Sequence, residues 1–389
     1  MSRLGKYIAK RMSAKDYEDE LQRLIREYNK KQSTYLFVYA ASFVKNIPEI
    51  PLNMDDYFII SDLLQSTKSK GLHFYIESPG GSAEAAEEIV ECFRDKFEHV
   101  SFVISGEAKS AGTILALSGN EIYMTDSGSL GPIDAQIKIG RTVSSAYDYM
   151  EWVNLKRKEA EKFGKLNPFD ATMIAQISPG ELTGVNNALN FAMDLIKEWI
   201  PKYKFKDWAK TETRKIDVTE EHKKKRAEEI AKALVNHSIW RSHGRSLKIK
   251  DLGNYLKINR IDDDPVLADI VYSIQTVIRL LFSSSNTFKI FFTADEKIVR
   301  NAVAPNQPIR LPSLKKPDVV DLEVSCPKCG RKYPLYGKFI KNPKIDADFQ
   351  AKGKINLSGL DKIACECGFT INILGIKNDI EIKMGRKFV

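Results

Sequence analysis

The feature that most constrains the fold is an alternation of short β-forming runs with helical runs between residues 34 and 126. Apolar and β-branched side chains fill the short runs, whereas the longer runs place apolar residues at helical spacing. The expected strands cover residues 34–42, 72–77, 99–105 and 121–126, and the expected helices cover residues 54–67, 83–96 and 111–119. Strands separated by helices imply right-handed crossovers and a parallel sheet that is covered on both faces. The sequence therefore predicts an α/β fold for this half of the chain.

The pattern changes after the expected sheet, and this change suggests several domains. Further helices are expected at residues 144–163, 186–200 and 228–237, followed by a helix and a strand before residue 300. Residues 305–318 contain four prolines, which is typical of a linker because proline cannot continue a helix or a central strand. The predicted parts are an N-terminal helix at 1–32, a main domain at 33–260, a helix-strand extension with the linker at 261–315, and a small domain at 316–389.

Length and composition fit a globular protein. The chain has 389 residues, of which 43% are hydrophobic, so it can bury a large core. Its net charge of +9 is compatible with a nucleic-acid partner, although 51 acidic residues are mixed among the 60 basic ones. The longest apolar stretches are too short or too polar for a bilayer, and the first residues lack the apolar core of a signal peptide. We therefore expect a cytoplasmic protein with no membrane span.

Four of the five cysteines lie in the last 70 residues and have the spacing of a metal site. They form two pairs, each followed by glycine, and can place four thiolates around one zinc ion. The expected ligands are Cys326, Cys329, Cys365 and Cys367. The tail resembles a zinc ribbon, although its second pair has one intervening residue instead of two, and free or redox-active thiols are the alternative. With four thiolates the zinc would have a structural role, because no coordination position stays open.

Two successive strand-to-helix junctions could form an active site. The first contains Ser78-Pro79-Gly80-Gly81, where two glycines can turn backbone N–H groups outward to hold an oxyanion. The second contains Ser110, among small residues at the start of the helix expected at 111–119. Serine at such a position usually caps the helix. However, consecutive β-α units bring both junctions to the same edge of a parallel sheet, which is where sites form in α/β proteins.

These motifs carry a resemblance to a known family. The order SPGG, GEAKSAG and DSGSLGPID resembles the Clp protease proteolytic subunit and signal peptide peptidase A, which are crotonase-like serine peptidases. It is most similar to the serine dehydrogenase proteinase family, which also shares the later WRSHGR motif. The resemblance covers about residues 33–260 and implies a spiral of β-α units. It also implies that Ser110 is the nucleophile and that Gly81 and Ala111 donate to the oxyanion.

The base that activates Ser110 is less directly indicated. In the Clp subunit a histidine occupies the place where Asp134 stands here, and the acid comes later, near the position of His243. Our hypothesis is that the two have exchanged places, with His243 as general base and Asp134 as orienting acid, since a triad is defined by geometry. The alternative is a lysine base, as in signal peptide peptidase A. Its candidates are Lys156, Lys158, Lys162 and Lys165.

The sequence thus favours a serine endopeptidase that acts on peptide or protein substrates, and the resemblance implies a homo-oligomer. A second hypothesis is a catalytically inactive oligomeric scaffold whose zinc ribbon binds nucleic acid or a protein partner. The lysines that would serve this binding are Lys315, Lys316, Lys328, Lys332 and Lys338. Any ATP dependence must come from another chain, because no nucleotide-binding loop of the GxxxxGK type is present.

Overall fold

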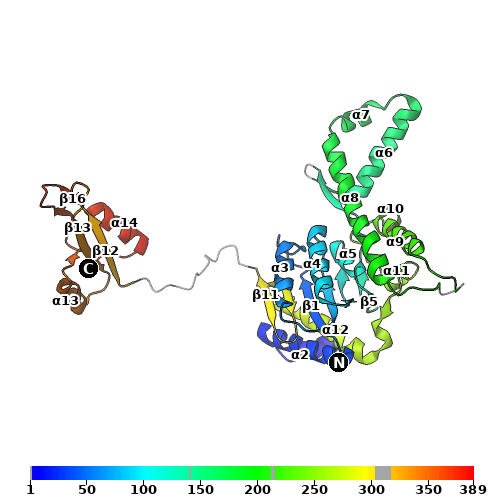
Figure 1. Cartoon of the computed structure of the whole chain (residues 1–389), viewed down its shortest axis with the longest axis horizontal. Coiled ribbons are helices and arrows are strands. Elements are labelled where there is room, and N and C mark those ends of the chain that lie inside the picture. Colours follow the sequence, from blue (N-terminus) through cyan, green and yellow to red (C-terminus); the bar gives the residue numbers. More distant parts are fainter. Residues whose placement is uncertain (1, 140–141, 212–214, 303–316) are drawn as a thin grey trace. The chain divides into compact units, whose positions relative to one another are not determined.

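The computed structural model describes residues 2–139, 142–211, 215–302 and 317–389 (Figure 1). The chain divides into two compact units, Met1–Val303 and Ala304–Val389, which are described separately below. Most of the predicted proline-rich linker, residues 303–316, lies outside the described residues.

The first unit is built on a seven-stranded sheet. Its strands follow the order β11 (Lys297–Asn301), β10 (Thr287–Phe292), β1 (Tyr35–Ala41), β2 (Gly71–Glu77), β3 (His99–Ile104), β5 (Glu121–Met124) and β9 (Asn259–Arg260). The strands from β1 to β9 are parallel, which confirms the predicted α/β class. The edge differs from the expected all-parallel sheet, since β10 runs antiparallel to β1 and to β11. The connection between β10 and β11 is too short for a crossover, so only an antiparallel pair can form there.

Helices cover both faces of this sheet (Figure 1). They are α2 (Ala14–Gln32), α3 (Met54–Leu63), α4 (Ala83–Lys96), α5 (Ala111–Leu117) and α12 (Pro265–Ser284). Successive side chains of β1 point to opposite faces, as in any strand. Phe37 and Tyr39 pack with α3, α4 and α5, whereas Leu36 and Val38 pack with α2 and α12. The near-continuous apolar strands predicted from the sequence therefore correspond to a sheet buried on both sides.

Helix α12 is long and apolar enough to cross a membrane by length and composition, with a mean hydropathy of 1.5 over its most apolar window. Of that window, 56% is buried, and Ile270, Ile274 and Val277 belong to the core that α12 shares with α2. In this structure α12 thus packs as a core helix. The expected lack of a membrane span stays a prediction.

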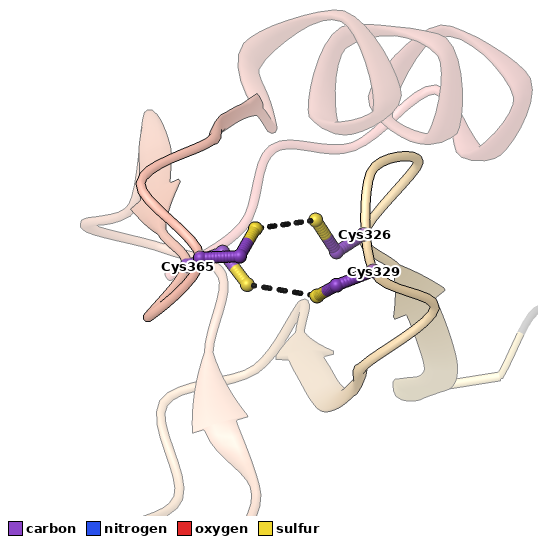
Figure 2. Close-up of side chains that lie close together, drawn as sticks. Cys326, Cys329 and Cys365 are labelled. Carbon is purple, nitrogen blue, oxygen red and sulfur yellow. Dashed lines mark hydrogen bonds between the residues drawn. The ribbon is translucent and has the colours of Figure 1, made fainter.

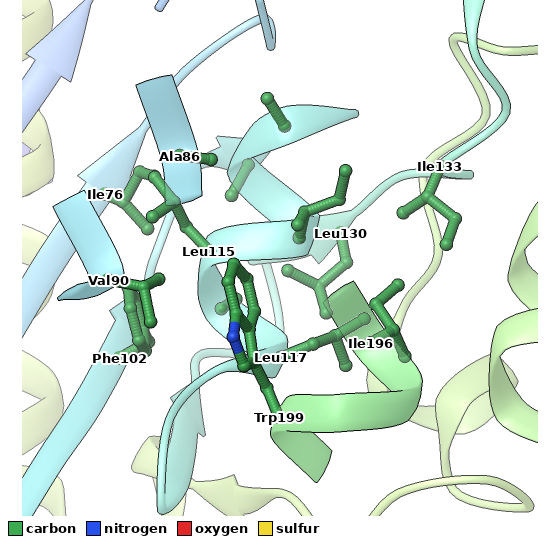
Figure 3. Close-up of a cluster of buried hydrophobic side chains, with 14 of the residues drawn as sticks. Ile76, Ala86, Val90, Phe102, Leu115, Leu117, Leu130, Ile133, Ile196 and Trp199 are labelled. Atoms are coloured by element: carbon green, nitrogen blue, oxygen red, sulfur yellow. The ribbon is translucent and has the colours of Figure 1, made fainter. Parts of the chain in front are cut away.

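A helical arm follows the sheet. It consists of the hairpin β7 (Gln136–Ile139) and β8 (Thr142–Ser145), then α6 (Ala146–Phe163), α7 (Pro168–Ile174), α8 (Pro179–Trp199), η1 (Ile200–Lys204) and α9 (Glu220–Val235). In Figure 1, α6 and α7 extend away from the sheet. The end of α8 returns to the core, where Ile196 and Trp199 lie with Leu115 and Leu117 of α5 (Figure 3). This packing anchors the arm next to α5, the helix that directly follows Ser110.

The remaining short elements of the first unit are α1 (Arg3–Ala9), β4 (Glu107–Ala108), β6 (Ser129–Leu130), α10 (His237–Trp240), α11 (Ile249–Leu252) and η2 (Ile261–Asp263).

The second unit is small and β-rich. It contains β12 (Val319–Ser325), β13 (Lys332–Lys338), α13 (Pro343–Ala351), β14 (Ile355–Asn356), β15 (Lys362–Ala364), β16 (Thr370–Asn372) and α14 (Leu374–Met384). Its core includes Leu335, Leu357 and Ile373 together with two cysteines, Cys326 and Cys365. This core is small, and cysteine side chains form part of it.

Candidate active site

The two strand-to-helix turns predicted to form the site contact each other. Strands β2 and β3 are parallel neighbours, so the turns that follow them meet at one edge of the sheet. The backbone N–H of Ser78 donates to the carbonyl oxygen of Glu107 at 2.8 Å, and that of Lys109 donates back to Ser78 at 2.9 Å. A Cβ atom on Gly80 would lie only 2.6 Å from the Cβ of Ser110. Only glycine fits here, and the two turns are in direct contact.

Ser110 adopts a backbone conformation that side chains rarely take. Its φ of 48° and ψ of −117° place it in the left-handed half of conformational space, which costs free energy for a residue with a Cβ. It occupies the N-cap position of α5, yet its side chain makes no capping hydrogen bond. A sharp, strained strand-to-helix turn is also how a nucleophilic serine is presented in α/β-hydrolases. The half-buried Ser110 therefore does not serve as the ordinary helix cap that was the alternative interpretation.

Two backbone N–H groups beside Ser110 are available as donors. Among the described residues, neither the amide of Gly81 nor that of Ala111 donates to a protein group. Gly81 has a φ of 150°, and a Cβ there would lie 2.3 Å from the backbone oxygen of Leu52. Leu52 brackets this turn, because its N–H donates to Gly80 at 2.8 Å and its carbonyl accepts from Ser82 at 2.9 Å. Unpaired amides held this firmly can stabilise negative charge that develops on a substrate oxygen.

A cavity of about 390 Å³ lies over the two turns. Gly80, Gly81, Ser110, Ala111 and His243 all line it. One part of its wall is apolar and comes from α5, the segment before β7, and α8: Ile114, Ile133, Ala188, Phe191 and Ala192. The structure thus brings the predicted nucleophile, the predicted oxyanion donors and the predicted base to one cavity, which can hold a reacting group.

His243 is paired with a buried carboxylate. Its Nδ1 lies 2.8 Å from Oδ1 of Asp134, whose side chain is 0% exposed, while the His243 side chain is 27% exposed. The other carboxylate oxygen, Oδ2, accepts a hydrogen bond from Nε2 of Gln136 at 3.0 Å. When Asp134 is ionised, Nδ1 of the neutral imidazole carries the proton and Nε2 keeps its lone pair. The arrangement can therefore accept a proton at Nε2 and stabilise the imidazolium that results.

The alternative lysines lie elsewhere, since no described residue that lines the cavity is a lysine. Lys156 is ion-paired with Asp170 at 2.9 Å and with Glu159 at 3.0 Å. Hydrogen bonds to these carboxylates raise the pKa of Lys156, the opposite of what a general base near neutral pH needs. Lys158 lines a separate cavity of about 620 Å³ between helices of the arm. Lys162 lies 5.1 Å from the ring centroid of Phe163, and Lys165 is exposed.

The four C-terminal cysteines come together in the second unit. Their sulfur atoms all lie within 4.8 Å of one another, with 3.7 Å between Cys326 and Cys367 and 3.5 Å between Cys329 and Cys365 (Figure 2). A tetrahedral ion with metal–sulfur bonds of about 2.3 Å requires sulfur separations of about 3.8 Å. The cluster has the donor set and the spacing of a metal site.

Both cysteine turns close in the same way despite their different lengths. The N–H of Gly330 donates to the carbonyl of Cys326, and that of Gly368 donates to the carbonyl of Cys365, each at 2.9 Å. Both glycines have positive φ, 75° and 83°. The missing residue in the second pair therefore does not prevent a tight turn that presents both of its sulfur atoms.

The lysines considered for nucleic-acid binding are mostly used inside the second unit. Lys332 is paired with Glu323 at 2.7 Å, Lys338 is paired with Asp346, and Lys328 donates to the carbonyl of Cys367 at 3.3 Å. Lys315 and Lys316 lie outside the described residues. Each of the three described lysines thus contacts a group within the second unit, and a binding partner for this unit stays a prediction.

Two residues that contact the site were not identified from the sequence. Leu52 brackets the glycine turn from a segment that precedes it by a whole helix, and no local motif marks it. The side chain of Lys109, the residue before Ser110, reaches the loop that carries His243. No sequence signal marks its role, because the burial of a single charged residue cannot be predicted from the sequence.

Parts of the chain are similar to known proteins. Residues 50–223 match the sequence profile of the ClpP-like SDH-type serine proteinase family. An uncharacterised protein of Methanocaldococcus jannaschii is 27% identical over 157 residues, which cover 40% of this chain and 50% of that protein. Another from the same organism is 36% identical over 62 residues, or 16% of this chain and 21% of that protein. The chain therefore spans half or less of the length of these curated relatives.

Among solved structures, a mutant of the 1510-N membrane-bound stomatin-specific protease in complex with a substrate peptide is 14% identical, with a TM-score of 0.33. The match covers 64% of this chain and 83% of that chain. The family match includes Gly81, Ser110, Ala111 and Asp134, whereas His243 lies beyond it. Residues 50–223 of this chain are thus similar to the ClpP-like SDH-type serine proteinase family.

Proposed function

We propose that the first unit hydrolyses peptide bonds as a serine endopeptidase, with Ser110 as nucleophile, His243 as general base and Asp134 as orienting acid. The observation that carries the proposal is the 2.8 Å pairing of His243 with the buried Asp134 at the same cavity as Ser110. The match of residues 50–223 to a serine proteinase family supports the serine-peptidase chemistry. It leaves the base open, so the choice of His243 rests on this pairing.

The proposed reaction uses each of these groups in turn. The hydroxyl of Ser110 attacks the carbonyl carbon of the scissile bond while its proton passes to Nε2 of His243. Negative charge on the carbonyl oxygen is stabilised by the N–H groups of Gly81 and Ala111. The imidazolium, held by Asp134, then gives its proton to the leaving amine. A water molecule repeats the sequence on the acyl-enzyme, which releases the second product and restores Ser110.

A lysine base is the competing mechanism and has less support. The four candidate lysines do not line the cavity, and the best buried of them, Lys156, is held by two carboxylates. The same substitution series separates the two mechanisms. Replacing Lys156 should leave the reaction of Ser110 unchanged, whereas replacing His243 should slow it strongly.

The test is active-site labelling together with hydrolysis of an unstructured protein. We expect a fluorophosphonate probe to label the wild type at Ser110. Ser110→Ala should abolish labelling and lower hydrolysis by about 10³-fold to 10⁶-fold. His243→Gln should lower hydrolysis by a comparable factor and leave a slow, measurable labelling, because Ser110 is still present. Ser283→Ala, at an exposed serine of α12 outside the site, is the matched control. The proposal is wrong if Ser110→Ala retains the hydrolysis of the wild type.

We further propose that the four-cysteine site holds zinc. Four thiolates fill a tetrahedral zinc site, so the ion would cross-link the two cysteine turns and leave no position open for catalysis. Cys326 and Cys365 also belong to the core of the second unit, so metal binding and folding of that unit are coupled. The homo-oligomer and the cytoplasmic location stay predictions.

A further inference from the structure

Lys109 is a buried amine that the proposed reaction does not use. Lys109 directly precedes the proposed nucleophile Ser110 in the chain and is only 5% exposed. The Nζ atom donates to the carbonyl oxygen of Leu130 at 3.4 Å, to that of Arg245 at 3.1 Å, and to Oγ of Ser246 at 2.8 Å. The carboxylate of Glu107 lies 3.7 Å away. Such a set of acceptors suits a charged ammonium, which has three N–H groups to donate.

This ammonium cannot replace the base. An amine that donates to three acceptors has no lone pair directed at Ser110, and Lys109 is absent from the described residues that line the cavity. Burial lowers the pKa of Lys109, and the nearby Glu107 carboxylate opposes this effect. These contacts therefore indicate that Lys109 stabilises the structure around it and does not transfer protons.

The segment that Lys109 holds is the one that carries His243. This segment is anchored before His243 by Trp240, whose Nε1 donates to the carbonyl of Ala233 at 2.7 Å. It is anchored after His243 by a pair of backbone hydrogen bonds between Leu247 and Leu130, at 2.9 and 3.1 Å. Between these anchors the chain is largely exposed and Arg241 has a φ of 62°. The ammonium of Lys109 contacts this segment from the protein interior, at Arg245 and Ser246, which directly follow the turn that contains His243.

Lys109 also contacts the segment that leads to Asp134. Its stem passes so close to Gly131 that a Cβ there would lie 2.9 Å from Cδ of Lys109. With the hydrogen bond to Leu130, one side chain thus touches both segments that bring the acid and the base, and its backbone is continuous with Ser110.

We propose that Lys109 is a positioning residue that fixes the His243 loop and the segment before Asp134 relative to the nucleophile. The inference rests on the proposed function, because it assigns the base to His243. A displacement of about 1 Å in a catalytic group can cost about 100-fold in rate. Loss of Lys109 should therefore slow the chemical step. The affinity of the cavity for a substrate should stay the same, because Lys109 does not line the cavity.

The experiment is a double-mutant cycle on fluorophosphonate labelling of Ser110 in the full chain. Lys109→Met keeps the length of the stem and removes the ammonium. We expect the maximal labelling rate to fall by about 10-fold to 100-fold, with an unchanged half-saturating probe concentration. In the His243→Gln background the same change should cost less than about twofold, because a base that is absent cannot be misplaced. Lys248→Met removes a similar contact, to the carbonyl of Gly128 at 3.1 Å, and is the control that should label normally.

Each other outcome overturns the inference. Equal losses from Lys109→Met in both backgrounds, or a loss as large in Lys248→Met, would mean that Lys109 does not act through His243. An unaffected Lys109→Met protein would mean that it does nothing for the reaction. If Lys109→Met does not fold, Ser246→Ala removes one acceptor from the loop and should show a smaller loss with the same dependence on His243. A wild type that is not labelled defeats the proposed function itself, whereas a labelled wild type with an impaired His243→Gln variant and a normal Lys109→Met variant defeats this inference alone.

Discussion

Replacing Lys289 with methionine should destabilise the first unit by about 3 to 5 kcal/mol. Nζ of Lys289 lies 2.9 and 2.8 Å from the two carboxylate oxygens of Asp56, and the two side chains are 1% and 0% exposed. Without the ammonium, the donors that remain for the carboxylate among the described residues are neutral: the hydroxyl of Tyr39 at 3.1 Å and the N–H of Asn53 at 3.0 Å. Removing one partner of a buried ion pair leaves an uncompensated buried charge, and the cost of that charge sets the expected loss of stability.

The loss should depend on pH, with a defined sign. Burial raises the pKa of Asp56, and the charge of Lys289 is the largest influence that lowers it. In Lys289→Met the folded-state pKa of Asp56 must rise further above its unfolded value. A raised carboxyl pKa gives stability that is present below the unfolded pKa and is lost as pH rises through the folded pKa. The variant should therefore lie closer to the wild type at about pH 5 than at about pH 8.

Tryptophan fluorescence during urea unfolding measures this effect, because the four tryptophans, at positions 152, 199, 208 and 240, all belong to the first unit. Lys297→Met is the matched control. That lysine pairs with Glu18 at 3.0 Å on a partly exposed surface, so its loss should cost at most about 1 kcal/mol. Adding Asp56→Asn to Lys289→Met should recover part of the loss. A Lys289→Met protein within about 1 kcal/mol of the wild type, or a deficit that is equal at both pH values, would refute the reasoning.

Three further predictions concern other groups. Burial raises the folded-state pKa of Glu77 to about 7, so the stability that its protonated carboxyl contributes is lost as pH rises from its ordinary pKa near 4.5. Between about pH 5 and pH 8, the free energy of unfolding of Glu77→Gln should therefore rise by up to about 3 kcal/mol relative to that of the wild type. A difference in melting temperature that stays constant with pH would contradict this. Gly80→Ala should abolish probe labelling because its Cβ would lie 2.6 Å from that of Ser110, whereas Gly184→Ala, where a Cβ meets nothing within 4 Å, should label normally. Elemental analysis should find a single zinc per chain, and Cys326→Ser should lose it and unfold the second unit without shifting the tryptophan transition; a wild type without bound metal would refute the zinc assignment.

Local signals in the sequence predict most elements of the sheet. Helix α4 covers the same residues that were expected, because Ser82 caps it and its apolar residues follow helical spacing. Helix α8 was expected to begin at residue 186 and begins at Pro179 instead. Proline at the first helical position, after the capping Ser178, starts this helix.

Long-range contacts account for what the sequence could not indicate. The meeting of the two turns was predictable, because consecutive β-α units must bring them to one edge. The position of β10 beside β1, the bracket formed by Leu52 and the buried pair of Lys289 with Asp56 each join residues far apart in the chain. No local propensity records such pairings, and a lysine at residue 289 looks like any exposed lysine until the fold covers it.

The separation of Asp134 from His243 by 109 positions has a consequence for the order in which the proposed active site forms. During synthesis, the N-terminal part of a chain folds first. The hydroxyl of Ser110 and its amide donors can be assembled while the arm is still being made, but the proposed base arrives only after α9. A nascent chain would thus carry the nucleophile without the means to activate it. Such latency would protect the chain itself and its neighbours on the ribosome from premature cleavage.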